Sequence, residues 1–438
     1  MKIRRVNTAH EELDAFLQAA RADLERIAEL VAVIGREVTT RGNQALFEYS
    51  RRFDGAEITE ENFKVSAAEK DRAYTLVDEA FLKALRAAIA KIRAFHNRQR
   101  KNSWFEPDEQ GNLLGQIIRP VERVGIYVPG GTAAYPSSVL MNAIPAQVAG
   151  VRELVMATPP NAKGEVNPYT LVAAAELGID EIYKMGGAQA VFALARGTET
   201  IKKVDLITGP GNIYVTVAKK MVYGEVNIDM LAGPSEILVI ADGKADPAYL
   251  AADLMSQAEH DTMARSMLVT PEEALLDRVE AEIQKQIRDL SRREIIEEAL
   301  AKNGVFILTA DLDEACRVAN LIAPEHLELM VEDPFAMLSK VKNAGAIFMG
   351  KYTPEPVGDY YAGPNHILPT GGTARFNSPV TVDTFMKTSS LLYYSRAGIR
   401  QDADDIIKLA MVEGLTAHAN SVRIRKEKAN GNEEDRPS

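Results

Sequence analysis

Short apolar runs that end in glycine or proline recur along the middle of the chain, and they constrain the fold more than any other feature. Val124–Val128 is followed by Pro129-Gly130-Gly131 and then by a segment rich in Ala, Val and Met with helical spacing. Leu154–Ala157 comes next and ends before a pair of prolines, and the rhythm continues through Glu181–Met185 and Asp205–Thr208. Strands that alternate with helices in this way predict βαβ units and a parallel sheet.

A second set of apolar runs follows further along the chain. The runs are Ile237–Ile240, Met267–Val269, Val305–Leu308 and Ala346–Met349, with charged amphipathic segments between them. After the first run, Asp246-Pro247 combines an N-cap residue with proline at the first helical position. We therefore expect an α/β protein that contains two units of similar build.

The flanks of these two units have different patterns. From His10 to about Arg100, apolar residues at three- and four-residue spacing predict helices. Residues 351–390 are rich in Gly, Pro and Thr and predict ordered loops. A helix is expected from about Asp402 to Glu413, and a disordered tail over residues 427–438.

Composition bounds the class of protein. The 438 residues carry a formal net charge of −11, which argues against nucleic acid as a partner. No apolar stretch is long enough to span a bilayer, and the charged N-terminus lacks the apolar region of a signal peptide. The single cysteine, Cys316, excludes an intrachain disulfide and favours the reducing cytoplasm. Its neighbours predict an amphipathic helix, so we expect a buried structural thiol, and not a nucleophile.

Four of the six histidines lie in polar clusters that suggest a divalent metal site. Gln257 and His260 are three residues apart at the end of the helix that begins at Pro247. Asp359 and His418 could complete a tetrahedral zinc site of nitrogen and oxygen ligands. A hydrogen-bonding pair at a helix end would explain Gln257 and His260 equally well. The two remaining histidines, His10 and His96, stand in charged helical stretches typical of a surface.

Glu325 and His326 form a second candidate site. They follow Pro324 and precede an alternating Leu327/Leu329 run, which places them at the start of a probable strand. A histidine near its usual pKa accepts protons at neutral pH, and an adjacent carboxylate can activate water. A polar pair exposed to solvent at the start of a strand is the alternative.

Glycine-rich loops end several of the apolar runs, at the edge where α/β sheets bind ligands. They are Pro129-Gly130-Gly131-Thr132, Gly186-Gly187-Ala188-Gln189, Gly209-Pro210-Gly211-Asn212 and Gly233-Pro234-Ser235. None matches GxGxxG, and no GxxxxGK[ST] loop exists, so the dinucleotide fingerprint is absent. The loops are ordinary turns, or a cofactor binds them by another geometry.

Several long stretches, in the same order, resemble the histidinol dehydrogenase family from about residue 20 to residue 425. They are VGIYVPGGTAAYPSSVLMNAIPAQVAG (124–150), ITGPGNIYVTVAKK (207–220), NIDMLAGPSEILVIAD (227–242), DLMSQAEHD (253–261), APEHLEL (323–329), VGDYYAGPNHILPTGGTARF (357–376) and EGLTAHANSVRIR (413–425). Motifs of this length in this order are far more specific than any one of them alone.

The resemblance implies a role for each matching residue. It implies zinc ligands at Gln257, His260, Asp359 and His418, and a catalytic acid–base pair at Glu325 and His326. It implies substrate contacts at Ser235, Glu413 and His326 and at the four metal ligands, and NAD contacts at Tyr127, Gln189 and Asn212. Every one of these positions carries the residue that the family has there.

The implied activity is that of an NAD-dependent dehydrogenase, which oxidises L-histidinol to L-histidine through L-histidinal with two NAD, the last steps of histidine biosynthesis. One Zn²⁺ per subunit would orient the substrate, and no thiol would be needed, so Cys316 should be dispensable. The resemblance also implies a cytoplasmic homodimer in which Glu413 and His418 come from the other subunit. A paralogue that acts on another small diol, such as a sulfonated propanediol, is the alternative.

For the fold, the resemblance implies two incomplete Rossmann-like α/β domains with small helical extensions at both ends. The expected divisions are an N-terminal helical segment (1–22), a first domain (23–123 with 236–378), a second domain (124–235) and a C-terminal dimerisation segment (379–438).

Overall fold

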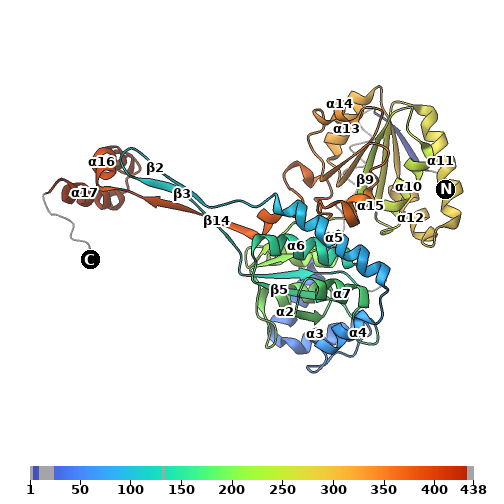
Figure 1. Ribbon diagram of the computed structural model, residues 1–438, viewed down its shortest axis with the longest axis horizontal. Helices are drawn as coiled ribbons and strands as arrows, with labels where there is room; N and C mark the ends of the chain where they lie inside the picture. Colours follow the sequence, from blue (N-terminus) through green and yellow to red (C-terminus); the bar gives the residue numbers. More distant parts are fainter. Residues whose placement is uncertain (1–2, 9–23, 131–133, 432–438) are drawn as a thin grey trace. The chain divides into compact units, whose positions relative to one another are not determined.

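The computed structural model describes residues 3–8, 24–130 and 134–431. The chain divides into two compact units (Figure 1). The first contains residues 1–99 and 121–385, and the second contains residues 100–120 and 386–438. None of the helices in the described ranges is long and apolar enough to cross a membrane.

One parallel sheet of the first unit has the strand order β1-β11-β10-β9-β12-β13. Its strands are β1 (Arg4–Asn7), β9 (Glu236–Ala241), β10 (Arg265–Thr270), β11 (Val305–Leu308), β12 (His326–Met330) and β13 (Ala346–Met349). Helices α10 (Pro247–Ala258), α11 (Glu273–Gln286) and α12 (Arg293–Asn303) pack on one face, and α13 (Leu312–Ile322) and α14 (Pro334–Leu338) pack on the other. Strands β9 and β12 are buried along their whole length, as a sheet covered on both faces requires.

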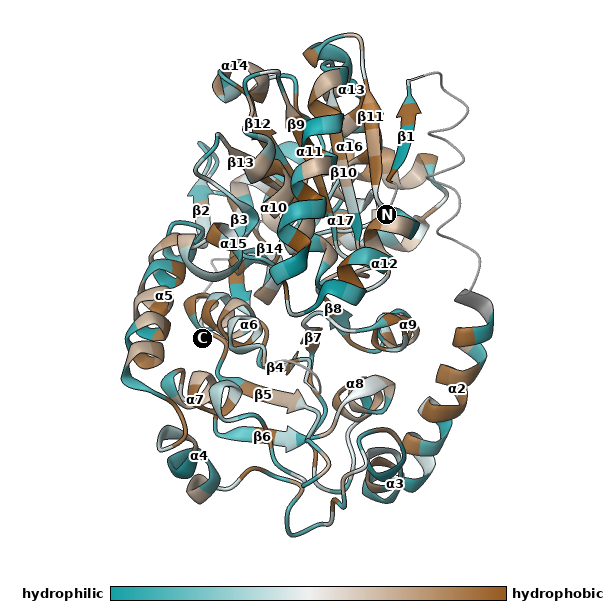
Figure 2. Cartoon of the chain, turned by 90° about the vertical axis from the view of Figure 1, so that its right-hand side faces the viewer, coloured by the Kyte–Doolittle hydropathy of each residue, from teal (hydrophilic) through white to brown (hydrophobic). Residues whose placement is uncertain are grey.

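The other parallel sheet of this unit has the order β6-β5-β4-β7-β8. Its strands are β4 (Arg123–Tyr127), β5 (Glu153–Thr158), β6 (Glu181–Lys184), β7 (Leu206–Thr208) and β8 (Asn227–Ile228). One face is covered by α2 (Leu24–Arg41), α3 (Asn43–Phe53), α8 (Gly187–Arg196) and α9 (Ile213–Val222). The other is covered by α4 (Ala67–Tyr74), α5 (Glu79–Asn97), α6 (Pro136–Ala149) and α7 (Pro168–Glu176), and Figure 2 shows both layers.

The two parallel sheets of the first unit have the same strand order. This confirms the expected α/β fold, in which two sheets with their helices are of similar build. If the five strands from β4 to β8 are numbered by chain position, their spatial order is 3-2-1-4-5, and β9 to β13 give the same order, with β1 added beyond β11. This is the order of a Rossmann-like sheet that lacks its last strand. The strand order reverses between β4 and β7 in one sheet, and between β9 and β12 in the other.

The second unit is built around a three-stranded antiparallel sheet in the order β14-β3-β2. Its strands are β2 (Trp104–Pro107), β3 (Leu113–Pro120) and β14 (Met386–Tyr393), and Met386 pairs with Pro120. Helices α16 (Arg396–Val412) and α17 (Thr416–Asn430) pack against each other. The prediction of loops up to residue 390 was therefore wrong over β14. The expected disordered tail is helical up to Asn430, and residues 432–438 lie outside the described ranges.

The buried clusters differ from the expected domain division. Residues 4–7, expected in a helical segment, form β1, because they pair in parallel with β11. Residues 9–22 of that segment lie outside the described ranges. Helices α2 to α5 were grouped with the sheet of β9 to β13, but their apolar faces pack on the sheet of β4 to β8. Strands β2 and β3 belong to the second unit, since they pair with each other and with β14.

Two single-residue expectations have opposite outcomes. Cys316 is buried in α13, as predicted, and burial raises the pKa of its thiol. His96 is fully buried, so its assignment to the surface was wrong. It lies in line with the buried Leu85, Ala88 and Ile92 along α5, and its Nδ1 is 2.8 Å from Gln99 Oε1. His10 lies outside the described ranges.

Candidate active site and metal centre

Helix α10 carries the first pair of predicted metal ligands. Its start follows the sequence signal, because the Asp246 side chain accepts a hydrogen bond from Ala248 N and Pro247 occupies the first turn. Gln257 is in the last turn and is fully buried, whereas His260 lies just past the helix end and is exposed. The end of this helix therefore places Gln257 in the interior of the protein and His260 at the surface.

A third residue joins the predicted ligands into one cluster. His260, Glu355 and Asp359 each offer a donor atom, and these atoms all lie within 4.8 Å of one another. Glu355 begins the short helix α15 (Glu355–Val357), and Asp359 lies in the π-helical turn Gly358–Ala362. With its nitrogen turned toward the carboxylate, the Gln257 amide is 3.1 Å from Glu355 Oε2. This set of imidazole, amide and carboxylate donors fits a borderline divalent cation such as zinc.

Two further buried acids lie next to Glu355. Glu328, on β12, accepts a hydrogen bond from Glu355 N at 2.9 Å, and Asp253, on α10, forms a side-chain hydrogen bond with Glu328. Burial raises the pKa of Glu355 to about 7 and that of Asp253 to about 6. Burial also opposes the charge on Asp359, but the nearby imidazole of His326 holds the pKa of this carboxyl below its usual value. So many carboxyl groups in one place suit a bound cation.

Glu325 and His326 are buried at the start of β12, which argues against a polar pair exposed to solvent. The main chain of Glu236, the first residue of β9, holds both of them. Glu236 N donates to Glu325 Oε2 at 2.9 Å, and Glu236 O is 3.0 Å from His326 Nδ1. A carbonyl oxygen can only accept, so Nδ1 carries the hydrogen, and Nε2 is left as the basic nitrogen.

His326 Nε2 is buried and has no hydrogen-bond partner among the described residues. The Oδ1 atom of Asp359 is 3.7 Å away, beyond hydrogen-bond distance. Burial lowers the pKa of His326, but the charges of Glu355, Glu325 and Asp359 outweigh burial and hold the pKa well above its usual value. Burial raises the pKa of Glu325 to about 8. A histidine nitrogen and a carboxyl group, both poised for proton transfer, therefore lie beside the metal-ligand cluster.

The loop before β9 is fixed to a distant part of the chain. Gly233 N donates to Thr370 Oγ1, and Gly371 N donates to Glu236 Oε1 at 2.9 Å. The half-buried Ser235, a predicted substrate contact, lies between these two anchors. The loop thus places Ser235 next to the residue that holds Glu325 and His326.

The predicted NAD contacts lie at the carboxyl edge of the sheet β4 to β8. Tyr127 ends β4, Gln189 is in the first turn of α8, and Asn212 is the N-cap of α9. The Tyr127 hydroxyl accepts a hydrogen bond from Gly187 N at 3.0 Å, and burial raises its pKa to about 12. The buried Gln189 Oε1 has no partner among the described residues. Tyr127 and Asn212 follow β4 and β7, between which the strand order reverses, and Gln189 follows the edge strand β6. Rossmann-like sheets bind nucleotides beside the point of reversal, at the carboxyl ends of their strands.

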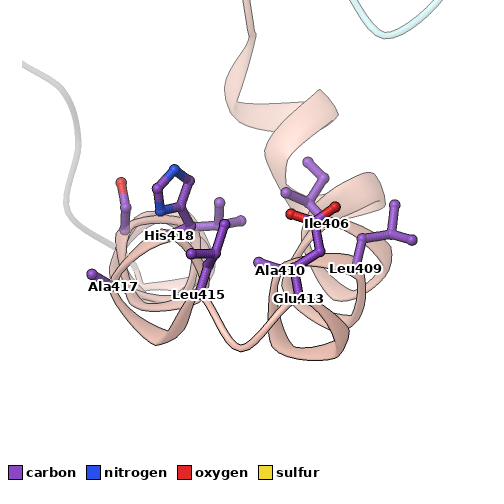
Figure 3. A pocket seen from close by; sticks show the side chains of 9 residues that line it. Ile406, Leu409, Ala410, Glu413, Leu415, Ala417 and His418 are labelled. Carbon is purple, nitrogen blue, oxygen red and sulfur yellow. The ribbon is translucent and has the colours of Figure 1, made fainter.

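Glu413 and His418 line a groove between α16 and α17 in the second unit (Figure 3). The groove has a volume of about 560 Å³, and its other walls are mostly apolar, with Leu409 and Leu415 among them. Both polar side chains are exposed. They are not part of the cluster formed by His260, Glu355 and Asp359.

Sequence reasoning missed three residues of this site. Glu355 stands four residues before Asp359, so helical spacing was a signal for it. Glu236 is next to Ser235, but its role depends on main-chain contacts that no sequence pattern shows. His366 is the fourth of the histidines in polar clusters, and the sequence suggested no role for it; its Nδ1 is 3.0 Å from Asp359 O, so it orients the loop that carries this carboxylate.

Comparisons with known proteins identify the family of this chain. The histidinol dehydrogenase family model matches residues 17–426. A histidinol dehydrogenase from Heliobacterium mobile is 61% identical over 417 residues, with 95% of this chain and 98% of the relative covered. One from Carboxydothermus hydrogenoformans is 56% identical, with 95% and 97% covered. The crystal structure of histidinol dehydrogenase from Elizabethkingia anophelis superposes with a TM-score of 0.93 at 37% identity, covering 98% of this chain and 99% of that one. The chain is therefore an enzyme of the histidinol dehydrogenase family.

Proposed function

We propose that this enzyme oxidises L-histidinol to L-histidine through L-histidinal, with zinc bound at the active site and two NAD consumed. The observation that carries the proposal is the buried Nε2 atom of His326, which has no hydrogen-bond partner in the described part of the chain and lies beside a cluster of side chains that could bind a metal ion. A base with an open nitrogen next to a cation site suits removal of a proton from a bound alcohol.

The donor chemistry supports one zinc ion per subunit. Gln257, His260 and Asp359 would hold it, and His418 would be the fourth ligand. Bound there, zinc supplies positive charge that orients the substrate through its imidazole and amino nitrogens. Glu355 lies within the same cluster and would support these ligands. Positive charge at the cluster would also offset the acids that raise the pKa of His326, and would favour its neutral, basic form.

His326 would accept the hydroxyl proton of histidinol at Nε2 in the first oxidation, with its tautomer fixed by Glu236 O. Glu325 would then take a proton from the water that attacks the aldehyde carbon of histidinal. His326 would act again as base when the hydrated aldehyde is oxidised. NAD is the hydride acceptor in both oxidations, held at Tyr127, Gln189 and Asn212. Every step uses oxygen and nitrogen bases, so Cys316 would be dispensable.

Substrate recognition would involve Ser235 and Glu413 besides the metal ligands. A carboxylate such as Glu413 can accept a hydrogen bond from the amino group of histidinol, and this favours histidinol over a sulfonated diol, whose anionic group it would repel.

We also propose that the enzyme is a cytoplasmic homodimer, in which each active site receives Glu413 and His418 from the partner. The second unit exposes large apolar side chains that a partner subunit could cover. They include Tyr393 (60%), Leu409 (67%), Leu392 (69%) and Val412 (74%). Exposed apolar surface of this kind marks interaction sites. A second copy of the chain is the partner that would also complete the predicted ligand set.

The test is the number of NADH molecules formed per histidinol consumed by the zinc-loaded enzyme. Two per histidinol is expected, whereas one would indicate a simple alcohol dehydrogenase. 2,3-Dihydroxypropanesulfonate is the comparison substrate. Oxidation of this diol without any oxidation of histidinol would replace our proposal with the paralogue. Removal of zinc by a chelator should abolish NADH formation, and added zinc should restore it.

A further inference from the structure

A buried ion pair lies beneath one of the glycine-rich loops. Lys219 is on α9, and Asp229 comes directly after β8. Their side chains are 3% and 0% exposed, and the Lys219 ammonium is in direct contact with Asp229 Oδ1. Neither residue has a part in the proposed chemistry.

Both charged groups are directed at the same residue of the loop, Gly209. Lys219 Nζ donates to Gly209 O at 3.0 Å, and Gly209 N donates to Asp229 Oδ2 at 2.8 Å. The carbonyl oxygen of Gly209 is thus held by a buried cation, and its N–H group by a buried anion. The Oδ1 atom of Asp229 also accepts a hydrogen bond from Met230 N at 2.6 Å, which fixes the carboxylate itself.

The conformation of Gly209 shows why such a clamp is useful. Its φ angle is +122°, and a Cβ atom there would lie 2.0 Å from Tyr127 O. The loop is therefore pressed against the end of β4, in a conformation open only to glycine. Three residues later, Asn212 caps α9 by accepting hydrogen bonds from Tyr214 N and Val215 N. A shift at Gly209 would move Asn212 relative to Tyr127.

We infer that Lys219 and Asp229 are positioning residues for the cofactor, because they hold the loop 209–212 against Tyr127. A buried ion pair adds little net stability in general, since desolvation offsets its attraction, whereas it can fix one geometry. The inference rests on the proposed binding of NAD at Tyr127 and Asn212. Beyond that proposal, the geometry of the NAD site at Tyr127 and Asn212 would depend on the buried ion pair of Lys219 and Asp229.

The test compares Lys219→Met, the neutral double variant Lys219→Met/Asp229→Asn, and Arg123→Met. Arg123 is the matched control, since it is a buried cation of the same sheet, paired with Glu153 and Glu181 at the opposite, amino end of β4. The readouts are NADH binding by fluorescence titration, KM for NAD, kcat, zinc content and melting temperature.

We expect Lys219→Met to raise Kd for NADH and KM for NAD by about tenfold, which corresponds to the loss of about one well-placed contact. The value of kcat at saturating NAD and the zinc content should stay close to wild type. The double variant leaves no lone buried charge and should show the same change with a smaller loss of stability. Arg123→Met should lower the melting temperature without a change in either constant.

Wild-type cofactor affinity in both Lys219 variants would overturn the inference, as would a similar loss in Arg123→Met. Failure of both Lys219 variants to fold, with Arg123→Met folded, would assign the pair to the fold and would also overturn it. NADH titration does not depend on the substrate. A wild-type enzyme that binds NADH but leaves histidinol unoxidised would therefore refute the proposed function separately.

Discussion

Glu325→Gln is the change that best separates the two oxidations. Glutamine has nearly the shape of glutamate and keeps an oxygen that can accept the 2.9 Å hydrogen bond from Glu236 N. The buried start of β12 should therefore stay intact. What is lost is the carboxylate that would take a proton from water, while His326, the base for the first oxidation, remains.

The expected loss follows from the role of Glu325. General-base catalysis contributes about 10²–10⁴-fold, so oxidation of histidinal should slow by about that factor, whereas conversion of histidinol to histidinal should stay close to wild type. The assay is NADH formed per histidinol in the presence of an aldehyde trap. The ratio should fall from about two to about one, and histidinal should be captured.

The pH dependence gives an independent measure. Burial raises the pKa of Glu325 to about 8, so the carboxylate form appears only as the pH rises toward that value. At about pH 6, two units lower, about 1% of the groups would be ionised. Wild-type oxidation of added histidinal should therefore increase about tenfold per pH unit up to about pH 8 and then level off, and Glu325→Gln should lack this increase. Oxidation of histidinal by the variant at the wild-type rate would refute the reasoning.

Three further predictions concern other parts of the first unit. His326→Asn should lower NADH formation from both histidinol and histidinal by about 10²–10⁴-fold while zinc per subunit is unchanged, and loss of zinc as well would make His326 a ligand. Glu355→Gln should weaken zinc binding by about 10–100-fold in a competition with a chelator, and wild-type affinity would remove Glu355 from the metal centre. Phe306→Ala, at a fully buried position of β11, should reduce the free energy of unfolding by about 3–5 kcal/mol in urea, and a loss below about 1 kcal/mol would show that the cavity collapses.

Most strands of the parallel sheets could be predicted from the sequence because they are marked locally, whereas β1, expected in a helical segment, and the two-residue β8 were not. Runs such as Val124–Val128 and Ile237–Ile240 are largely apolar, and a glycine, a proline or a helix cap follows within a few residues. The antiparallel sheet of the second unit could not be predicted in this way. β14 pairs with β3 across more than half of the chain, and no local pattern specifies so distant a partner.

The site was predictable to the extent that its residues belong to long motifs. His260 and Asp359 lie close to Glu355, and the Gln257 amide is 3.1 Å from the same carboxylate, whereas the role of these residues and of His418 as zinc ligands stays a prediction. The tautomer of His326 could not be predicted, since it depends on a main-chain carbonyl of the neighbouring strand. The burial of His96 could have been predicted, because it continues the apolar spacing of Leu85, Ala88 and Ile92 in spite of its charged neighbours.

The two sheets of equal topology use opposite edges. The proposed NAD contacts follow the carboxyl ends of β4, β6 and β7, whereas Glu325, His326 and Ser235 stand at the amino ends of β12 and β9. The loops directly after the carboxyl ends of β9, β10 and β12 (residues 242–246, 271–272 and 331–333) carry none of the proposed site residues. An affinity tag or a fluorescent label inserted at residues 243–244 or 332–333 should leave turnover intact, so that the active enzyme could be purified or observed through it.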